Sequence, residues 1–167
     1  GYTLLNLAGL SIGLVSCLLI VLYISHELSY DGFHSNKERM YRINYDVMMG
    51  DKQVLSPSVP VFVAPQLKNQ FPEIEEATRF SSEWRPRTIR HDDIMFDEPG
   101  FCYADPNFFK VMDFKAVQGD LSTALSRPNT LVITEKMAHK YFGNASPLGE
   151  RLNFNNKKDF EIAAVVD

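Results

Sequence analysis

The chain has 167 residues, a formal net charge of −4 and a mildly negative mean hydropathy. These averages conceal two segments, because all 17 basic and 21 acidic residues and all four histidines lie after Ser25. The net charge argues against a nucleic-acid partner, which usually requires a basic surface. Cys17 lies in the apolar segment and Cys102 in the charged one, so we expect no disulfide between them.

The apolar segment has the length of a membrane span. Leu4 to Ile24 is 21 residues without charge, or about 31 Å as a helix, which matches a hydrocarbon core of roughly 30 Å. Thirteen of these residues are Leu, Ile or Val, which favour insertion by on the order of 5 kcal/mol. A signal peptide would have a shorter apolar core and a cleavage site, and neither is present. We therefore predict a transmembrane helix within residues 1–25.

Small and polar residues gather on one side of this predicted helix. Asn6, Gly9, Gly13 and Ser16 follow one another at spacings of three, four and three, which places them within one arc of the helix surface. Small residues allow a second membrane helix to approach closely. We predict a helix-packing face here, although Gly and Ser are also common in membrane helices by chance.

Residues 26–39 follow the span and are interpreted as a junction. Glu27, Asp31 and His34 would align on one face of a helix, but the pair Asp31-Gly32 weakens a helix and the oxygen ligands are few. We interpret them as polar residues at a solvent-exposed helix end, not as a metal site. We interpret Tyr30 as an anchor at the membrane–water interface. No Lys or Arg lies between residues 26 and 36. The positive-inside rule then predicts a cytoplasmic N-terminus and an extracytoplasmic domain after about residue 26.

Residues 40–167 alternate between strand and helix patterns, which predicts the α+β class. Thr134 is a candidate N-cap and Gly143 a candidate C-terminal residue for a helix between them, and Asp105 is expected to cap a helix that begins at Pro106. The expected strands are 41–47, 53–55, 77–80, 94–96, 100–103, 131–133, 152–154 and 160–166, and the expected helices are 65–71, 106–112 and 135–142. The last two strands, joined by "NNKKD", predict a hairpin.

No motif in the chain predicts a catalytic, cofactor or metal site. The run "GNASPLGE" from Gly143 has five residues between its glycines and then a glutamate, whereas a P-loop has four and then Lys-Ser or Lys-Thr. The basic residues Arg85, Arg87, Arg90 and His91 are matched by neighbouring acids. We expect this cluster to be a solvated loop.

The order of segments resembles a known family. "NLAGLSIGL" followed by "ELSYDGFHSNKERMYRI" resembles the first membrane helix and outer junction of MacB/FtsX-type ABC transporter permeases, especially those of Bacteroidetes. "ADPNFFKVMDFKAVQGDLSTAL" and "PNTLVITEKMAHKYFGNASPLGERLNF" resemble the MacB-like periplasmic core domain. The resemblance implies a mixed α/β periplasmic domain at residues 40–167, incomplete at its C-terminus because the chain stops within an apolar stretch.

The same resemblance implies a role and partners. Such permeases lie in the bacterial inner membrane, pair with a cytoplasmic ABC ATPase subunit and a second permease copy or half, and relay ATP-driven motion to the periplasm. Those with MacB-like architecture also work with a periplasmic adaptor and an outer-membrane channel. It implies no enzyme activity in this chain, because ATP hydrolysis belongs to the ATPase subunit. A single-span membrane sensor with an extracytoplasmic ligand-binding domain is the alternative that the residues leave open.

Overall fold

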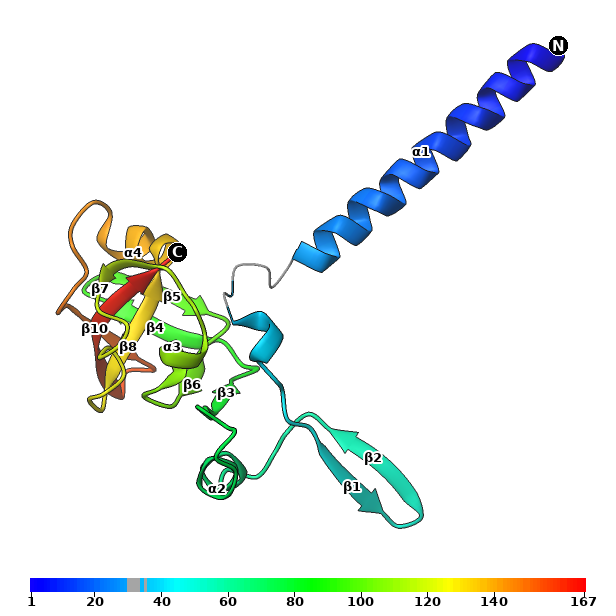
Figure 1. Cartoon of the computed structure of the whole chain (residues 1–167). Helices are drawn as coiled ribbons and strands as arrows, with labels where there is room; N and C mark the ends of the chain where they lie inside the picture. Colours follow the sequence, from blue (N-terminus) through cyan, green and yellow to red (C-terminus); the bar gives the residue numbers. More distant parts are fainter. Residues whose placement is uncertain (30–33, 35) are drawn as a thin grey trace. The chain divides into compact units, whose positions relative to one another are not determined.

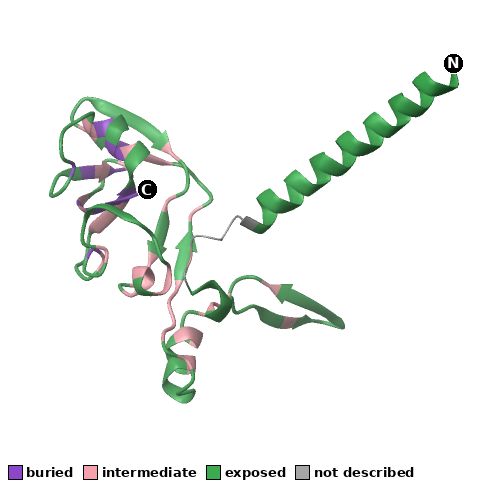
Figure 2. Ribbon diagram, turned by 45° about the horizontal axis from the view of Figure 1, so that its top comes forward, coloured by how far each residue is buried: buried purple, intermediate pink, exposed green. Residues whose placement is uncertain are grey.

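The computed structural model describes residues 1–29, 34 and 36–167 and divides the chain into two compact units, Gly1–Arg39 and Met40–Asp167 (Figure 1). The first unit consists of helix α1 (Tyr2–Ser29) and a 3-10 turn, η1 (Lys37–Arg39). Tyr2–Leu28 is long and apolar enough to cross a membrane, and all of its side chains are exposed (Figure 2). The helix runs past the expected end at residue 25, because His26, Glu27 and Leu28 include no helix-breaking glycine or proline.

The second unit begins with a separate two-stranded sheet. Strand β1 (Tyr45–Met49) pairs with β2 (Lys52–Ser56) in antiparallel register. The expected strand from residue 41 starts later, because Ser56 pairs with Tyr45 and is followed by Pro57, which has no N–H to extend the ladder. Helix α2 (Val63–Gln70) follows, with Pro65 in its first turn as expected.

A second small sheet and a short helix come next. Strand β3 (Phe80–Ser82) pairs with β6 (Cys102–Ala104), and helix α3 covers Phe108–Val111. The prediction that Asp105 caps this helix is wrong: Asn107 holds the N-cap position without a side-chain hydrogen bond. The Asp105 carboxylate is instead bound by Arg79, so it is not available to the helix N-terminus.

The main sheet has the strand order β5-β4-β9-β10-β7, with β8 on the opposite side of β10 from β9 and β7. Only the β8–β10 pair is parallel among the pairs of described residues. The strands are β4 (Arg87–His91), β5 (Ile94–Glu98), β7 (Ala116–Gly119), β8 (Thr130–Thr134), β9 (Arg151–Phe154) and β10 (Lys158–Val166). The expected hairpin near the C-terminus is confirmed as β9–β10.

Strand β4 corrects the prediction of a solvated loop at Arg85–His91. Its central residue, Ile89, is 2% exposed in the core, while the neighbouring Arg90 projects to solvent. Arginine can alternate with an apolar residue on an antiparallel strand whose outer face meets water. Of the four basic residues, Arg90 lies on the outer face of the paired strand, Arg87 and His91 share the face of Ile89, and Arg85 precedes the strand.

Helix α4 (Glu135–Phe142) has the predicted bounds and the predicted caps. Thr134 Oγ1 accepts a hydrogen bond from the Met137 N–H at 3.3 Å, and Gly143 takes a φ of 61° while its N–H bonds His139 O. Most of the buried side chains lie in the main sheet and α4 (Figure 2), and Ala124 and Pro147 are buried outside these elements. One apolar cluster consists of Ile89, Ile133, Ala138, Tyr141, Leu152, Phe154, Ile162 and Val165. The fold class, an apolar N-terminal helix followed by a mixed α/β domain, is as expected.

Candidate functional site

The predicted helix-packing residues all lie on α1 and are exposed. A Cβ added at Gly9 or Gly13 would meet no heavy atom within 4 Å, and Asn6 and Ser16 are exposed on the same helix. A surface of this kind can accept a second helix at short range. That it does so stays a prediction.

The junction residues are described only in part. Glu27 lies exposed near the end of α1, and His34 is half-buried. Tyr30 and Asp31 fall outside the described residues, so their predicted alignment with Glu27 and His34 is not tested. In the described part of the chain, no group of three His, Cys, Asp or Glu side chains could hold a metal ion.

A set of polar side chains joins α2 to the elements that follow it. At its centre, the Glu76 carboxylate accepts hydrogen bonds from Lys68 of α2 at 2.6 Å, from Lys110 of α3 and from the Asn107 amide at 3.1 Å. These donors, Lys110 first and then Lys68 and Asn107, lower the pKa of Glu76 from 4.5 to about 2. Glu76 therefore stays ionised over the whole physiological pH range.

Arg79 makes a second set of contacts beside the first. Its Nε and Nη2 donate to the two Asp105 carboxylate oxygens at 2.8 and 2.9 Å, and its Nη1 donates to the Val61 carbonyl at 2.7 Å. The side-chain hydrogen bonds from Arg79 hold the pKa of Asp105 below its ordinary value. We call Lys68, Glu76, Arg79, Asp105, Asn107 and Lys110 the polar clamp.

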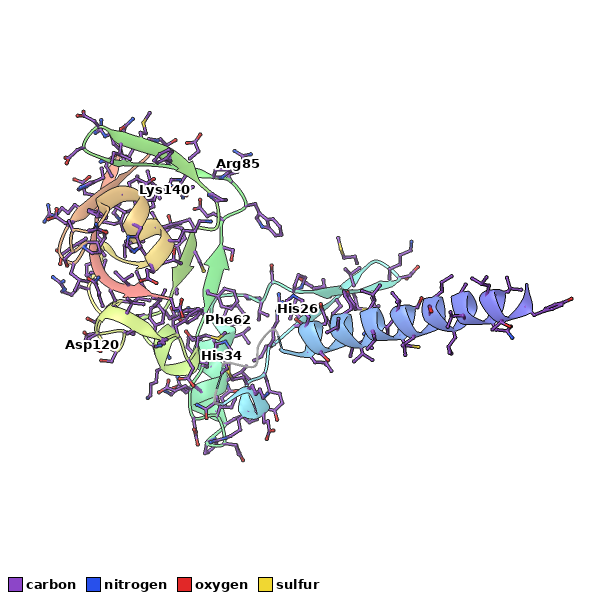
Figure 3. The ribbon with its side chains drawn as sticks, turned by 90° about the horizontal axis from the view of Figure 1, so that it is seen from above. His26, His34, Phe62, Arg85, Asp120 and Lys140 are labelled. Atoms are coloured by element: carbon purple, nitrogen blue, oxygen red, sulfur yellow. The ribbon has the colours of Figure 1, made fainter. Side chains whose placement is uncertain are left out.

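The polar clamp connects parts of the chain that lie far apart in the sequence. Val61 and Lys68 belong to the segment around α2, whereas Asp105, Asn107 and Lys110 precede or lie within α3. Phe62, which precedes α2, remains 58% exposed (Figure 3). No local pattern in the sequence predicts the clamp, because residues that contact one another in it lie up to 34 positions apart. Ion pairs between residues so far apart in the sequence form only once the fold brings the residues together.

A wide hollow lies on the outer face of the main sheet. It has a volume of about 560 Å³, opens widely to solvent and is lined mainly by polar and charged side chains from β4, β9 and β10. A small-molecule site typically encloses most of its ligand between apolar walls. This hollow does not have that form, and its residues show no pairing of nucleophile and base.

Comparison with protein families gives one match, which covers nearly the whole chain. Residues 3–167 match the family of the MacB-like periplasmic core domain. The chain belongs to this family. The match starts inside α1, so it covers the apolar helix as well as the domain. The resemblance to MacB/FtsX-type permeases is thereby confirmed. No curated protein matches the chain.

Solved structures support the MacB-like fold. A domain of a protein described as a permease from Porphyromonas gingivalis has 24% identity and a TM-score of 0.60, with 69% of this chain and 48% of that chain covered. The periplasmic region of MacB from Actinobacillus actinomycetemcomitans has 24% identity and a TM-score of 0.53, with 62% and 48% covered. The chain thus spans about half the length of these structures.

Family membership fixes the coarse function of this MacB-like domain. Domains of this family are periplasmic parts of ABC transporter permeases, which work with an ATPase subunit, and they are not known as enzymes. The apolar helix near the N-terminus fits an inner-membrane protein.

Proposed function

We propose that this chain is part of an ABC transporter permease subunit whose periplasmic domain relays ATP-driven motion for export or extraction of a substrate. The observation that carries the proposal is the continuous family match from residue 3, because it joins an apolar helix and a MacB-like domain in one unit of sequence. In this arrangement the N-terminus is cytoplasmic and the residues after about 26 are periplasmic. The absence of Lys and Arg between residues 26 and 36 supports this orientation.

The relay begins where α1 leaves the membrane. Residues 26–39 connect α1 to β1, β2 and α2, which come next in the chain. Motion of the helix reaches this part of the domain first. The polar clamp then ties α2 to α3 and to the segment before β3. Bidentate arginine–carboxylate contacts of this kind have a fixed geometry, which suits a connection that must transmit displacement.

The proposal includes partners outside this chain. ATP hydrolysis takes place in a separate cytoplasmic ABC ATPase subunit, and a second permease copy or half packs against α1 in the lipid bilayer. A periplasmic adaptor and an outer-membrane channel complete the pathway. A membrane sensor is the competing function, but the hollow of about 560 Å³ on the main sheet is open and lined mainly by polar side chains, which favours a relay over a small-molecule receptor at that place.

The test is coupled ATPase activity of the full-length permease reconstituted with its ATPase subunit. Gly13→Leu fills the open side of α1, so we expect it to reduce stimulation of ATP hydrolysis while leaving membrane insertion intact. Ala8→Leu adds the same side chain outside the predicted packing face and is the matched control. Equal ATPase stimulation in the Gly13→Leu variant and the parent protein would count against the packing face and the relay through it.

A further inference from the structure

The hairpin of β1 and β2 presents one largely apolar face. Alternate residues of a strand, and residues directly opposite each other on paired strands, share a face. The register therefore gives one face to Tyr45, Val47, Met49, Lys52, Val54 and Ser56. The opposite face carries Asp46, Met48, Gln53 and Leu55, so it is half polar. On the first face only the two residues at the ends of β2 are polar. We call Tyr45, Val47, Met49 and Val54 the apolar face.

No helix or strand of the described residues covers the apolar face. Tyr45 is 46% exposed, Met49 is 68% exposed and Val54 is 42% exposed (Figure 2). In the part of the chain that the structure describes, no further helix or strand packs extensively against β1 or β2. A two-stranded hairpin alone is marginally stable at best in water, and it needs a further strand or a helix against its apolar side.

The sequence of β1 is nevertheless that of a strand with one buried face. Apolar and polar residues alternate from position 41 to position 47, in the order Tyr41, Arg42, Ile43, Asn44, Tyr45, Asp46 and Val47. This period of two is typical of a half-buried strand. In the structure no residue of β1 is buried, and Val47 alone is half-buried. Because sequence pattern and packing normally agree, the element that covers this face lies outside the described residues.

We propose that further residues of the same polypeptide cover the apolar face, namely those that complete the fold of the solved relatives. This chain spans about half the length of those structures, one of which is the periplasmic region of MacB. An intramolecular partner covers the hairpin in every molecule, whereas a second copy would leave it uncovered in each free monomer. Lys52 lies on the same side of the hairpin, and its charge opposes burial in lipid. The inference rests on the shared fold and not on the proposed transport role, so either can fail without the other.

Hydrogen exchange of backbone amides, followed by mass spectrometry, tests this proposal. The full-length permease and the 167-residue chain are compared in the same detergent micelles. We expect the amides of residues 45–56 to exchange about tenfold or more slowly in the full-length protein. Burying even one of these apolar side chains favours the closed hairpin by about that factor. Equal exchange rates in the two proteins would overturn the proposal.

Met49→Gln and Met48→Gln are matched variants that test which face is covered. The two methionines are neighbours with 68% and 65% exposure, but they lie on opposite faces of β1. The readout is the exchange rate of residues 45–56 in the 167-residue chain divided by the rate in the full-length protein. Met49→Gln should lower this ratio about tenfold, because the full-length protein would bury its amide. Met48→Gln should change the ratio by no more than about twofold.

The remaining outcomes identify a different occupant. Unchanged exchange in β9 and β10 verifies that the main sheet of each variant is folded. An equal fall of the ratio in both variants would overturn the assignment of the covered face. Slower exchange of residues 45–56 when the 167-residue chain is concentrated would show that a second copy covers the hairpin. Slower exchange when liposomes are added to that chain would show that a bilayer does. Either result overturns the intramolecular partner.

Discussion

Gly119 at the end of β7 provides a sharp test of how the main sheet is packed. Its φ is 80°, and a Cβ at this position would lie 2.5 Å from Ala163 O and 2.9 Å from Ala164 Cα in β10. Alanine would therefore suffer two penalties: a backbone conformation that disfavours a side chain, and a clash with the neighbouring strand. Gly100 has nearly the same φ, 81°, but a Cβ there would meet nothing within 4 Å. Comparing alanine substitutions at Gly119 and Gly100 therefore separates the cost of the backbone conformation from the cost of the clash.

The left-handed conformation costs an alanine about 1–2 kcal/mol, and this is the whole expected effect of Gly100→Ala. Forcing an extra methyl against packed backbone adds about 1–3 kcal/mol, so Gly119→Ala should cost about 2–5 kcal/mol. At about 4 °C per kcal/mol for a domain of this size, the melting temperature should fall by about 8–20 °C for Gly119→Ala. The corresponding fall for Gly100→Ala is about 4–8 °C.

Near-ultraviolet circular dichroism of the full chain in detergent micelles measures this unfolding. Tryptophan fluorescence is a poor reporter, because the single tryptophan, Trp84, is 99% exposed. The near-ultraviolet signal comes from aromatic side chains such as Tyr141 and Phe154, which are both buried in the core. Equal melting temperatures for Gly119→Ala and Gly100→Ala would refute the close approach of β7 to β10.

Two further predictions concern side-chain contacts of the domain. The pKa of Glu76 is lowered from 4.5 to about 2, so its contribution to stability is complete above pH 4.5 and is lost as the pH falls towards 2. Glu76→Gln should weaken the dependence of the unfolding free energy on pH in this acidic range, measured by an acid titration of unfolding. An unchanged dependence of the unfolding free energy on pH would contradict the clamp. The Tyr141 hydroxyl donates to Glu98 Oε1 at 3.0 Å; Tyr141→Phe should cost about 1–3 kcal/mol in urea unfolding. Tyr103→Phe, at an exposed hydroxyl, is its control, and an equal loss in both would contradict the prediction.

Elements with local signals were predictable from the sequence. Helix α4 has the expected bounds because Thr134 and Gly143 lie next to it in the chain and set its ends through their own hydrogen bonds and backbone angles. The apolar helix follows from composition alone, since a run without charge needs no information about distant residues.

Elements that depend on distant partners were not predictable in the same way. Strand β4 was mistaken for a loop because its arginines suggest solvent, while its partner Phe154 lies 65 positions after Ile89. Asp105 was assigned to the α3 N-terminus because the sequence does not show Arg79, 26 positions earlier, taking its carboxylate. The polar clamp was missed for the same reason, because its contacting residues lie up to 34 positions apart in the sequence.

The side of the membrane on which the domain lies tests the central claim most directly. Cys102 on β6 is an exposed free thiol, and Cys17 lies within the apolar helix. A membrane-impermeant sulfonated maleimide applied to spheroplasts that express the full-length protein should label Cys102 before lysis, and Cys102→Ser should abolish this labelling. Labelling of Cys102 only after lysis would place the domain in the cytoplasm and contradict a periplasmic relay.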